Sequence, residues 1–185
     1  MATGFKLTRK GITANLESGE RDLLRKLFVD VQALLEPDTA ADADPLAAMV
    51  GIDAAASVPT DPALLRLLPN GLKGDEEGAL EFRRFTERSL RESKQAALRA
   101  AALQLESVPL RLDTEQAQLF ARALNDVRLV LGDRLGLDTD EDAERLQDIT
   151  DPSRALDVDG YLALVYNFVT WLQDTLMKAL LNSLR

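Results

Sequence analysis

Neither cysteine nor histidine occurs among the 185 residues of this sequence. Without cysteine, the chain can form neither a disulfide framework nor a thiolate metal site. Without histidine, it cannot build a His-based catalytic triad, an imidazole proton shuttle or most zinc sites. Any chemistry would have to use carboxylate, lysine, tyrosine, hydroxyl or arginine side chains. We therefore expect no cofactor and no metal site.

Aromatic residues are also scarce, at 5% of the chain, whereas leucine and alanine dominate. This composition predicts a mainly α-helical protein. The length is enough for one substantial core, so we expect residues 1–185 to form a single domain with an irregular excursion at 36–78. The most apolar run, residues 161–172, is too short to span a bilayer. No signal-peptide pattern is visible, and we expect a cytoplasmic protein without a membrane partner.

Positive charge is limited but unevenly distributed. The formal net charge is −9, which disfavours non-specific attachment to nucleic acid. Residues 79–112 nevertheless carry +3, between −6 for residues 37–78 and −7 for residues 113–185. The chain therefore has a basic segment between two acidic blocks, which would neutralise one another or leave a surface for an acidic partner.

The basic segment coincides with the longest uninterrupted helical pattern, residues 76–105, which contains no proline and no glycine after Gly78. At about 1.5 Å per residue this helix would be about 45 Å long. Its apolar residues recur at spacings of three, four and seven. We expect a broad buried face made of Phe82, Phe85, Ser89, Leu90, Ala96, Ala97, Ala100, Ala101, Leu103 and Leu105.

The remaining patterns predict a bundle of about four longer helices with a small two- or three-stranded sheet at one end. The related stretches 12–20 and 108–116 each lead from an alternating segment into a capped helix, and their strands could lie side by side. The expected elements are a hairpin over 4–16, long helices over 18–35, 76–105, 114–135 and about 157–184, and short helices over 44–50, 61–68 and up to about 149.

One candidate partner-binding surface lies on the basic helix. It consists of Arg84, Arg88, Arg91 and Lys94. Glutamates are interleaved with these cations, so i,i+3 and i,i+4 pairs explain part of the pattern. We favour internal ion pairs over an external ligand for this face, and no interleaved aromatic residue supports nucleic-acid binding.

A second candidate is a structural polar cluster, for which we expect no catalytic role. Asp126 lies between Ala123 and Val130 on an apolar flank, where a carboxylate needs a partner. We expect that partner to be Arg83 or Arg84 of the long helix. The cluster comprises Arg83, Glu87, Asn125, Asp126 and Arg128.

The last helix is apolar on nearly every side. Tyr161, Tyr166 and Trp171 add aromatic surface to it. More sides are apolar than one packed layer needs, so this helix is a candidate homodimer interface.

Four stretches in order carry a family resemblance: residues 66–69 (RLLP), 81–87 (EFRRFTE), 123–132 (ALNDVRLVLG) and 165–173 (VYNFVTWLQ). Together they resemble the actinobacterial family of uncharacterised proteins called DUF2017. The resemblance implies a link to Clp-type regulated proteolysis, since genes of that family often lie beside that of a Clp-protease adaptor. Some members are labelled transcriptional regulators.

Three function classes follow from these observations. The first is a non-enzymatic protein-interaction or regulatory protein whose basic helix, or a groove beside it, receives an acidic segment of another protein. The second is a DNA-binding transcriptional regulator, with the hairpin and one helix acting as a winged unit. The third and weakest is an enzyme, which would need a deep pocket lined by Arg84, Glu87 and Asp126.

Overall fold

The computed structural model describes residues 2–37, 56–139, 141–142 and 157–184. Within these ranges it confirms a mainly α-helical fold with a small sheet. The expected short helices at 44–50 and before 149 lie outside the described residues. The elements are β1 (Thr3–Thr8), β2 (Gly11–Asn15), α1 (Ser18–Leu34), α3 (Pro62–Leu67), α4 (Glu76–Gln104), β3 (Leu110–Leu112), α5 (Thr114–Arg134) and α7 (Val158–Ser183).

The sheet is antiparallel with strand order β1-β2-β3, which confirms that the two related stretches place their strands side by side. One face of the sheet is buried against the core. Ile12 of β2 and its cross-strand partner Leu112 of β3 both lie on this face and are buried. On the outer face Thr13 pairs with Lys6 on one side and with Arg111 on the other. The sheet therefore covers the core with one face and presents a polar face outward.

Local capping explains where two of the long helices begin. Before α1, the Glu17 N–H donates to the Glu20 carboxylate at 2.7 Å, and the two residues form a capping box. The expected box before α5 is confirmed: the Gln116 N–H donates to Asp113 Oδ1 at 2.8 Å, and the Asp113 N–H donates to Gln116 Oε1 at 3.0 Å. These boxes satisfy backbone donors that a helix start leaves free.

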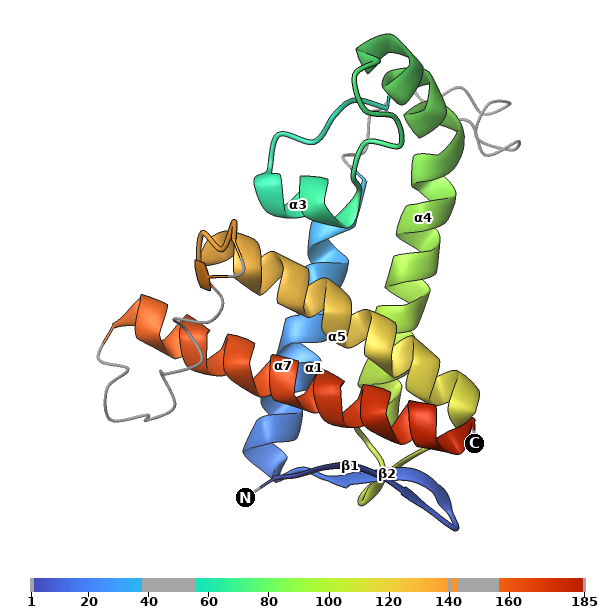
Figure 1. The fold of residues 1–185 in the computed structure, drawn as a ribbon, viewed down its shortest axis with the longest axis vertical. Coiled ribbons are helices and arrows are strands. Elements are labelled where there is room, and N and C mark those ends of the chain that lie inside the picture. Colours follow the sequence, from blue (N-terminus) through green and yellow to red (C-terminus); the bar gives the residue numbers. More distant parts are fainter. Residues whose placement is uncertain (1, 38–55, 140, 143–156, 185) are drawn as a thin grey trace.

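The long helices form two crossed pairs (Figure 1). α5 and α7 lie side by side and cross α1 and α4, while the sheet closes one end beneath α7. Phe120 of α5 joins these parts, because its ring meets those of Phe5 in β1 and Phe28 in α1 edge-on, each at a centroid distance of 5.6 Å. The N–H of Phe5 also donates to Thr175 Oγ1 of α7 at 3.1 Å.

The expected buried face of α4 is only partly right, because its residues Ala97, Ala101 and Leu105 are buried but most of the others are exposed. Phe82, Phe85 and Leu103 are exposed, and the core-facing residues of the helix are Ala79, Arg83, Glu87, Ala97, Leu98 and Ala101. The C-terminal half of α4 packs closely on α1 and α5 through its small residues, and this packing sets the rotation of the whole helix. The N-terminal half of α4 extends past α5 (Figure 1). The buried residues in this half include the charged pair Arg83 and Glu87.

α7 combines a buried apolar side with an exposed aromatic one. Val165, Val169 and Leu172 are buried, whereas Tyr161 and Trp171 are exposed. No helix in the described ranges is long and apolar enough to cross a membrane. The homodimer through α7 stays a prediction.

Candidate partner-binding groove

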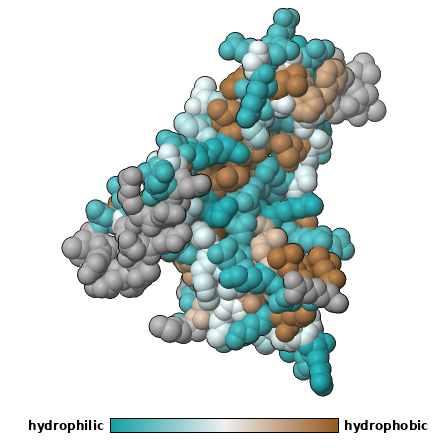
Figure 2. Space-filling view, in the orientation of Figure 1, coloured by the Kyte–Doolittle hydropathy of each residue, from teal (hydrophilic) through white to brown (hydrophobic). Residues whose placement is uncertain are grey.

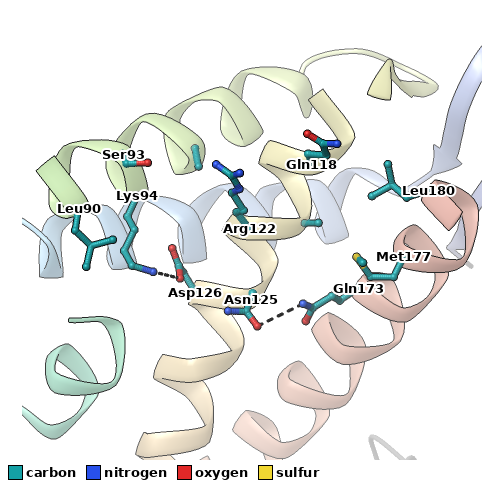
Figure 3. A pocket seen from close by; sticks show the side chains of 12 residues that line it. Leu90, Ser93, Lys94, Gln118, Arg122, Asn125, Asp126, Gln173, Met177 and Leu180 are labelled. Carbon is teal, nitrogen blue, oxygen red and sulfur yellow. Dashed lines mark hydrogen bonds and ion pairs between the residues drawn. The ribbon is translucent and has the colours of Figure 1, made fainter. Parts of the chain in front are cut away.

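Three helices surround a hollow of about 530 Å³ on the surface, which we call the α4–α5–α7 groove (Figure 3). Its lining mixes apolar, amide and charged side chains. The residues are Leu90, Ser93, Lys94 and Ala97 of α4, Gln118, Ala121, Arg122, Asn125 and Asp126 of α5, and Gln173, Met177 and Leu180 of α7.

An ion pair joins α4 to α5 at one side of the groove. Lys94 Nζ lies 2.6 Å from Asp126 Oδ1, and the two side chains are 19% and 4% exposed. Burial raises the pKa of the Asp126 carboxyl, while the hydrogen bond and charge of Lys94 oppose that rise. The expected pairing of Asp126 with Arg83 or Arg84 is wrong, because Lys94 is its partner and the two arginines lie about three helical turns from Lys94 along α4.

Arg122 adds a second cation to the same groove. It lies one turn before Asp126 on α5, and its guanidinium points toward α4 (Figure 3). It is exposed and makes no ion pair with any described residue. Among the described residues that line the groove there are therefore two cations and one carboxylate, and an incoming anion would meet their net positive charge.

Side-chain amides line the groove between α5 and α7. Gln173 Nε2 is 3.5 Å from Asn125 Oδ1, which is long for a hydrogen bond. Within the described part of the chain, Gln173 Oε1 is buried without a partner. Since an amide can donate and accept, Asn125 and Gln118, which lie two turns apart on α5, can bind main-chain groups of a bound segment.

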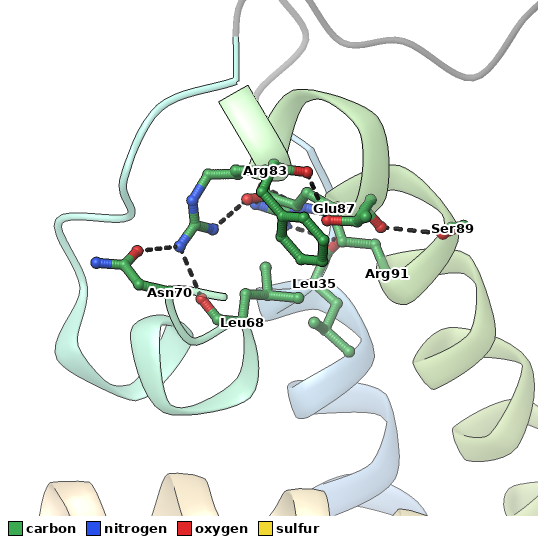
Figure 4. Close-up of polar contacts among 9 residues, drawn as sticks. Leu35, Leu68, Asn70, Arg83, Glu87, Ser89 and Arg91 are labelled. Carbon is green, nitrogen blue, oxygen red and sulfur yellow. Dashed lines mark hydrogen bonds and ion pairs between the residues drawn. The ribbon is translucent and has the colours of Figure 1, made fainter. Parts of the chain in front are cut away.

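A second polar cluster, Arg83–Glu87–Arg91, lies further toward the N-terminus of α4 (Figure 4). Arg83 donates to Glu87, to the Leu68 carbonyl at 2.9 Å and to Asn70 Oδ1 at 2.9 Å. Arg91 donates twice to Glu87 Oε1, at 2.8 and 2.7 Å, and once to the Leu35 carbonyl at 3.1 Å.

This cluster has a clear structural role. Leu35 and Leu68 are the C-terminal cap residues of α1 and α3, whose last carbonyls lack partners within their own helices. A guanidinium at a helix C-terminus also meets the favourable end of the helix dipole. Arg83 and Arg91 thus attach the ends of two other helices to α4, and Glu87 neutralises part of their charge.

A family model described as a domain of unknown function, DUF2017, matches residues 2–180. The chain belongs to this family. No curated protein and no solved structure matches it. The DUF2017 description assigns no activity.

In this DUF2017 chain, the residues expected on the basic face are separated. Arg84 and Arg88 are exposed, and Arg88 Nε lies 3.1 Å from Glu92 Oε1. Arg91 and Lys94 are instead held in the Arg83–Glu87–Arg91 cluster and in the pair with Asp126. The expected basic face is consequently divided between solvent and two internal contacts.

The predicted polar cluster is also split in two. Asn125 and Asp126 line the α4–α5–α7 groove, whereas Glu87 belongs to the cluster near Leu35. Arg128 is half-buried, and neither it nor Arg84 lines the groove. The set Arg84, Glu87 and Asp126 that an enzyme hypothesis required does not converge on this groove.

Sequence reasoning missed Arg122. Its signal is the polar stripe that it forms with Gln118 and Asn125, at helical spacings of four and three, on a helix that is otherwise largely apolar. A polar stripe of this kind can line a groove only if no neighbouring helix packs over it. The positions of α4 and α7 decide this, and the sequence of α5 alone does not show them.

Proposed function

We propose that this protein is a non-enzymatic interaction protein that binds an acidic segment of a partner protein in the α4–α5–α7 groove. The observation that carries the proposal is the exposed Arg122 guanidinium beside the Lys94–Asp126 pair. Arginine binds carboxylates through two parallel hydrogen bonds, which gives both strength and orientation. A carboxylate of the partner can therefore bind Arg122 and lie near Lys94 without displacing Asp126.

Apolar contacts support the same proposal. Leu90 of α4 and Met177 of α7 line the groove from two different walls and are 39% and 43% exposed. Covering such side chains is worth about 25 cal/mol for each Å² of apolar surface removed from water. The groove thus offers affinity through its apolar walls and selects for charge through its cations.

Only the membership in the DUF2017 family suggests a cellular process for this protein. The resemblance to DUF2017 makes Clp-type regulated proteolysis the process in which we propose to search first for the partner, and this link is associational. The groove itself requires only that the partner present an acidic segment.

The first experiment compares two charge reversals in a tagged protein expressed in its host. Arg122→Glu should abolish recovery of the partner, as measured by quantitative mass spectrometry. Arg99→Glu is the matched control, because Arg99 is an exposed arginine of α4 that does not line the groove. A partner recovered equally well with both variants would contradict the proposal.

The lack of cysteine makes a second measurement straightforward. Gln118→Cys places a single thiol in the groove for a photo-crosslinker, and Asn182→Cys places one on an exposed part of α7 outside it. We expect the first probe to crosslink to an acidic segment and the second not to do so. Equal crosslinking from both sites would mean that the partner does not occupy the groove.

A second candidate function, DNA binding, is favoured by one observation on the sheet. Its outer face has a shallow hollow of about 500 Å³ lined by four cations, and none of the described residues lining it is acidic. Cross-strand pairing places Lys6 and Arg111 on either side of Thr13. The cations are Lys6, Arg9, Lys10 and Arg111. Lysine, arginine and threonine are typical phosphate contacts, so the hairpin could bind a DNA backbone as a wing.

This candidate has its own test. The fluorescence anisotropy of a labelled 20-base-pair duplex should rise with protein at low salt, and the affinity should fall steeply as salt increases. The double variant Lys10→Glu and Arg111→Glu should remove that binding. If the wild-type protein does not bind at low salt, the second candidate is excluded.

A further inference from the structure

The α4–α5–α7 groove does not end at Leu90. A second hollow of about 370 Å³ continues along α4 toward its N-terminus, and Leu90 and Ser93 line both hollows. From Phe82 to Ala97, the two adjacent hollows together extend along about 22 Å of helix. We call the second one the Phe82 hollow; it is lined by Leu68, Pro69, Gly71, Phe82, Arg83, Thr86, Glu87, Ser89, Leu90 and Ser93.

The Phe82 hollow differs in chemistry from the groove. Phe82 is 50% exposed and lies against Gly71, where any side chain would collide with the ring. The two charged residues in the lining, Arg83 and Glu87, form a hydrogen bond with each other. Arg83 also donates to the carbonyl of the buried Leu68, and Glu87 also accepts from Arg91. This hollow therefore presents mainly apolar surface, and hydrophobic side chains are visible where α4 begins (Figure 2).

Resting on the proposed function, we infer that the partner segment is bipartite, with an apolar anchor in the Phe82 hollow and an acidic group at Arg122. The α4 residues that line the Phe82 hollow run from Phe82 to Ser93, and those that line the groove run from Leu90 to Ala97. The mid-points of these two ranges are about 9 Å apart along the helix. The anchor and the acid are therefore separated by about six residues in a helical segment, or by about three in an extended one.

Each half contributes something that the other lacks. Burial of the anchor against Phe82 and Leu90 supplies free energy without regard to charge. The pairing at Arg122 orients the segment along α4 and excludes segments with a basic residue at that position. A small anion would use only the Arg122 end, so dependence on both halves distinguishes a bipartite peptide from a simple anion site.

The probe for this inference is a library of random 16-residue peptides displayed on phage and selected on the immobilised full-length protein. Each enriched peptide is then synthesised with a fluorophore, and its dissociation constant is measured by anisotropy. The variants are Phe82→Ala with Phe85→Ala as its control, and Arg122→Gln with Arg99→Gln as its control. Phe85 is as exposed as Phe82 and lies on the same helix, but it does not line either hollow.

We expect the enriched peptides to share an apolar residue and an acid at the stated separation. Phe82→Ala and Arg122→Gln should each weaken binding by about tenfold or more, which is the effect of losing a major contact. Both controls should stay within about twofold of the wild type. Because all four positions are exposed, the variants should fold normally, and thermal melting checks this.

The outcomes separate this inference from the proposed function. Peptides that respond to Arg122→Gln but not to Phe82→Ala would overturn the bipartite segment and leave the acidic groove in place. Peptides that respond only to Phe82→Ala would overturn both, since no acid would then be recognised. If no peptide is enriched, or if the enriched peptides respond to neither variant, both ideas are also overturned.

Discussion

Lys94 Nζ of α4 lies 2.6 Å from Asp126 Oδ1 of α5, and this ion pair joins two long helices at the wall of the proposed binding groove. The Asp126 side chain is 4% exposed. Its carboxylate has little access to water and depends on the lysine for compensation. The pair therefore contributes to the packing of α5 on α4 as well as to the charge of the groove.

Removing only the lysine should be costly. We predict that Lys94→Met lowers the free energy of unfolding by about 3 kcal/mol, because a buried carboxylate loses its partner. The double variant Lys94→Met and Asp126→Leu should recover most of that loss, since it leaves no unpaired charge. Urea denaturation of the two single variants and the double variant measures this. A loss below about 1 kcal/mol for Lys94→Met would show that water already solvates Asp126.

The Arg83–Glu87–Arg91 cluster offers a matched comparison on one helix. Glu87 and Glu92 each pair with an arginine four residues away, but Glu87 is buried and Glu92 is exposed. Glu87→Gln should destabilise the protein by about 3 kcal/mol, because two inward-facing guanidinium groups would lose their counter-charge. Glu92→Gln should cost less than about 1 kcal/mol. Equal effects in urea denaturation would contradict the assigned role of the cluster.

The start of α3 should confer a pH-dependent part of the stability. The hydrogen bond from Arg134 Nη2, at 2.7 Å, is the main reason that the pKa of Asp61 lies below its usual value. A lowered pKa means that the folded state favours the ionised carboxylate. The resulting stability is present above the unfolded pKa of about 3.9 and is lost as the pH falls through the folded pKa.

The variant Asp61→Asn tests whether the stability conferred by the Asp61–Arg134 pair is lost as the pH falls. Asparagine keeps an oxygen that can accept from the Ala63 N–H, so the helix cap survives while the charge pairing with Arg134 is removed. The wild type should melt at a higher temperature than the variant at pH 6, and the difference should vanish at pH 2. A difference that is constant over this range would assign the effect to the cap and not to the charge.

The exposed aromatic side of α7 predicts a homodimer. Tyr161 and Trp171 are exposed, and the Phe168 and Trp171 ring centroids lie 6.2 Å apart. Light scattering at tens of micromolar should give twice the mass of one chain. Trp171→Glu should give a single chain, because a charge would have to be desolvated at the interface. A monomeric wild-type protein would contradict this prediction.

Much of the fold could be predicted from local patterns. The two capping boxes and the long helices follow from residues close together in the chain. The pairing of β2 with β3 followed from the related stretches before α1 and α5. These features depend on backbone hydrogen bonds and caps, which neighbouring residues can satisfy by themselves.

The candidate site was only partly predictable. The position of Asp126 on an apolar flank indicated a partner on the long helix, but the partner is Lys94 and not Arg83 or Arg84. Arg83 instead pairs with Glu87 and the end of α3. Arginine and lysine are equivalent in a charge pattern, so the choice between them depends on where α5 crosses α4.

By itself, the sequence determined the helical composition, the capped starts of α1 and α5, and the exclusion of histidine and cysteine chemistry. The tertiary structure decided which side of α4 is buried, and thereby exposed Phe82 while burying Arg83 and Glu87. The physical reason is that close packing of Ala97, Leu98 and Ala101 sets the rotation of a rigid helix along its whole length. Phe82, which lies beyond that contact, then faces solvent and lines the Phe82 hollow, where we propose that the apolar anchor of the partner segment binds.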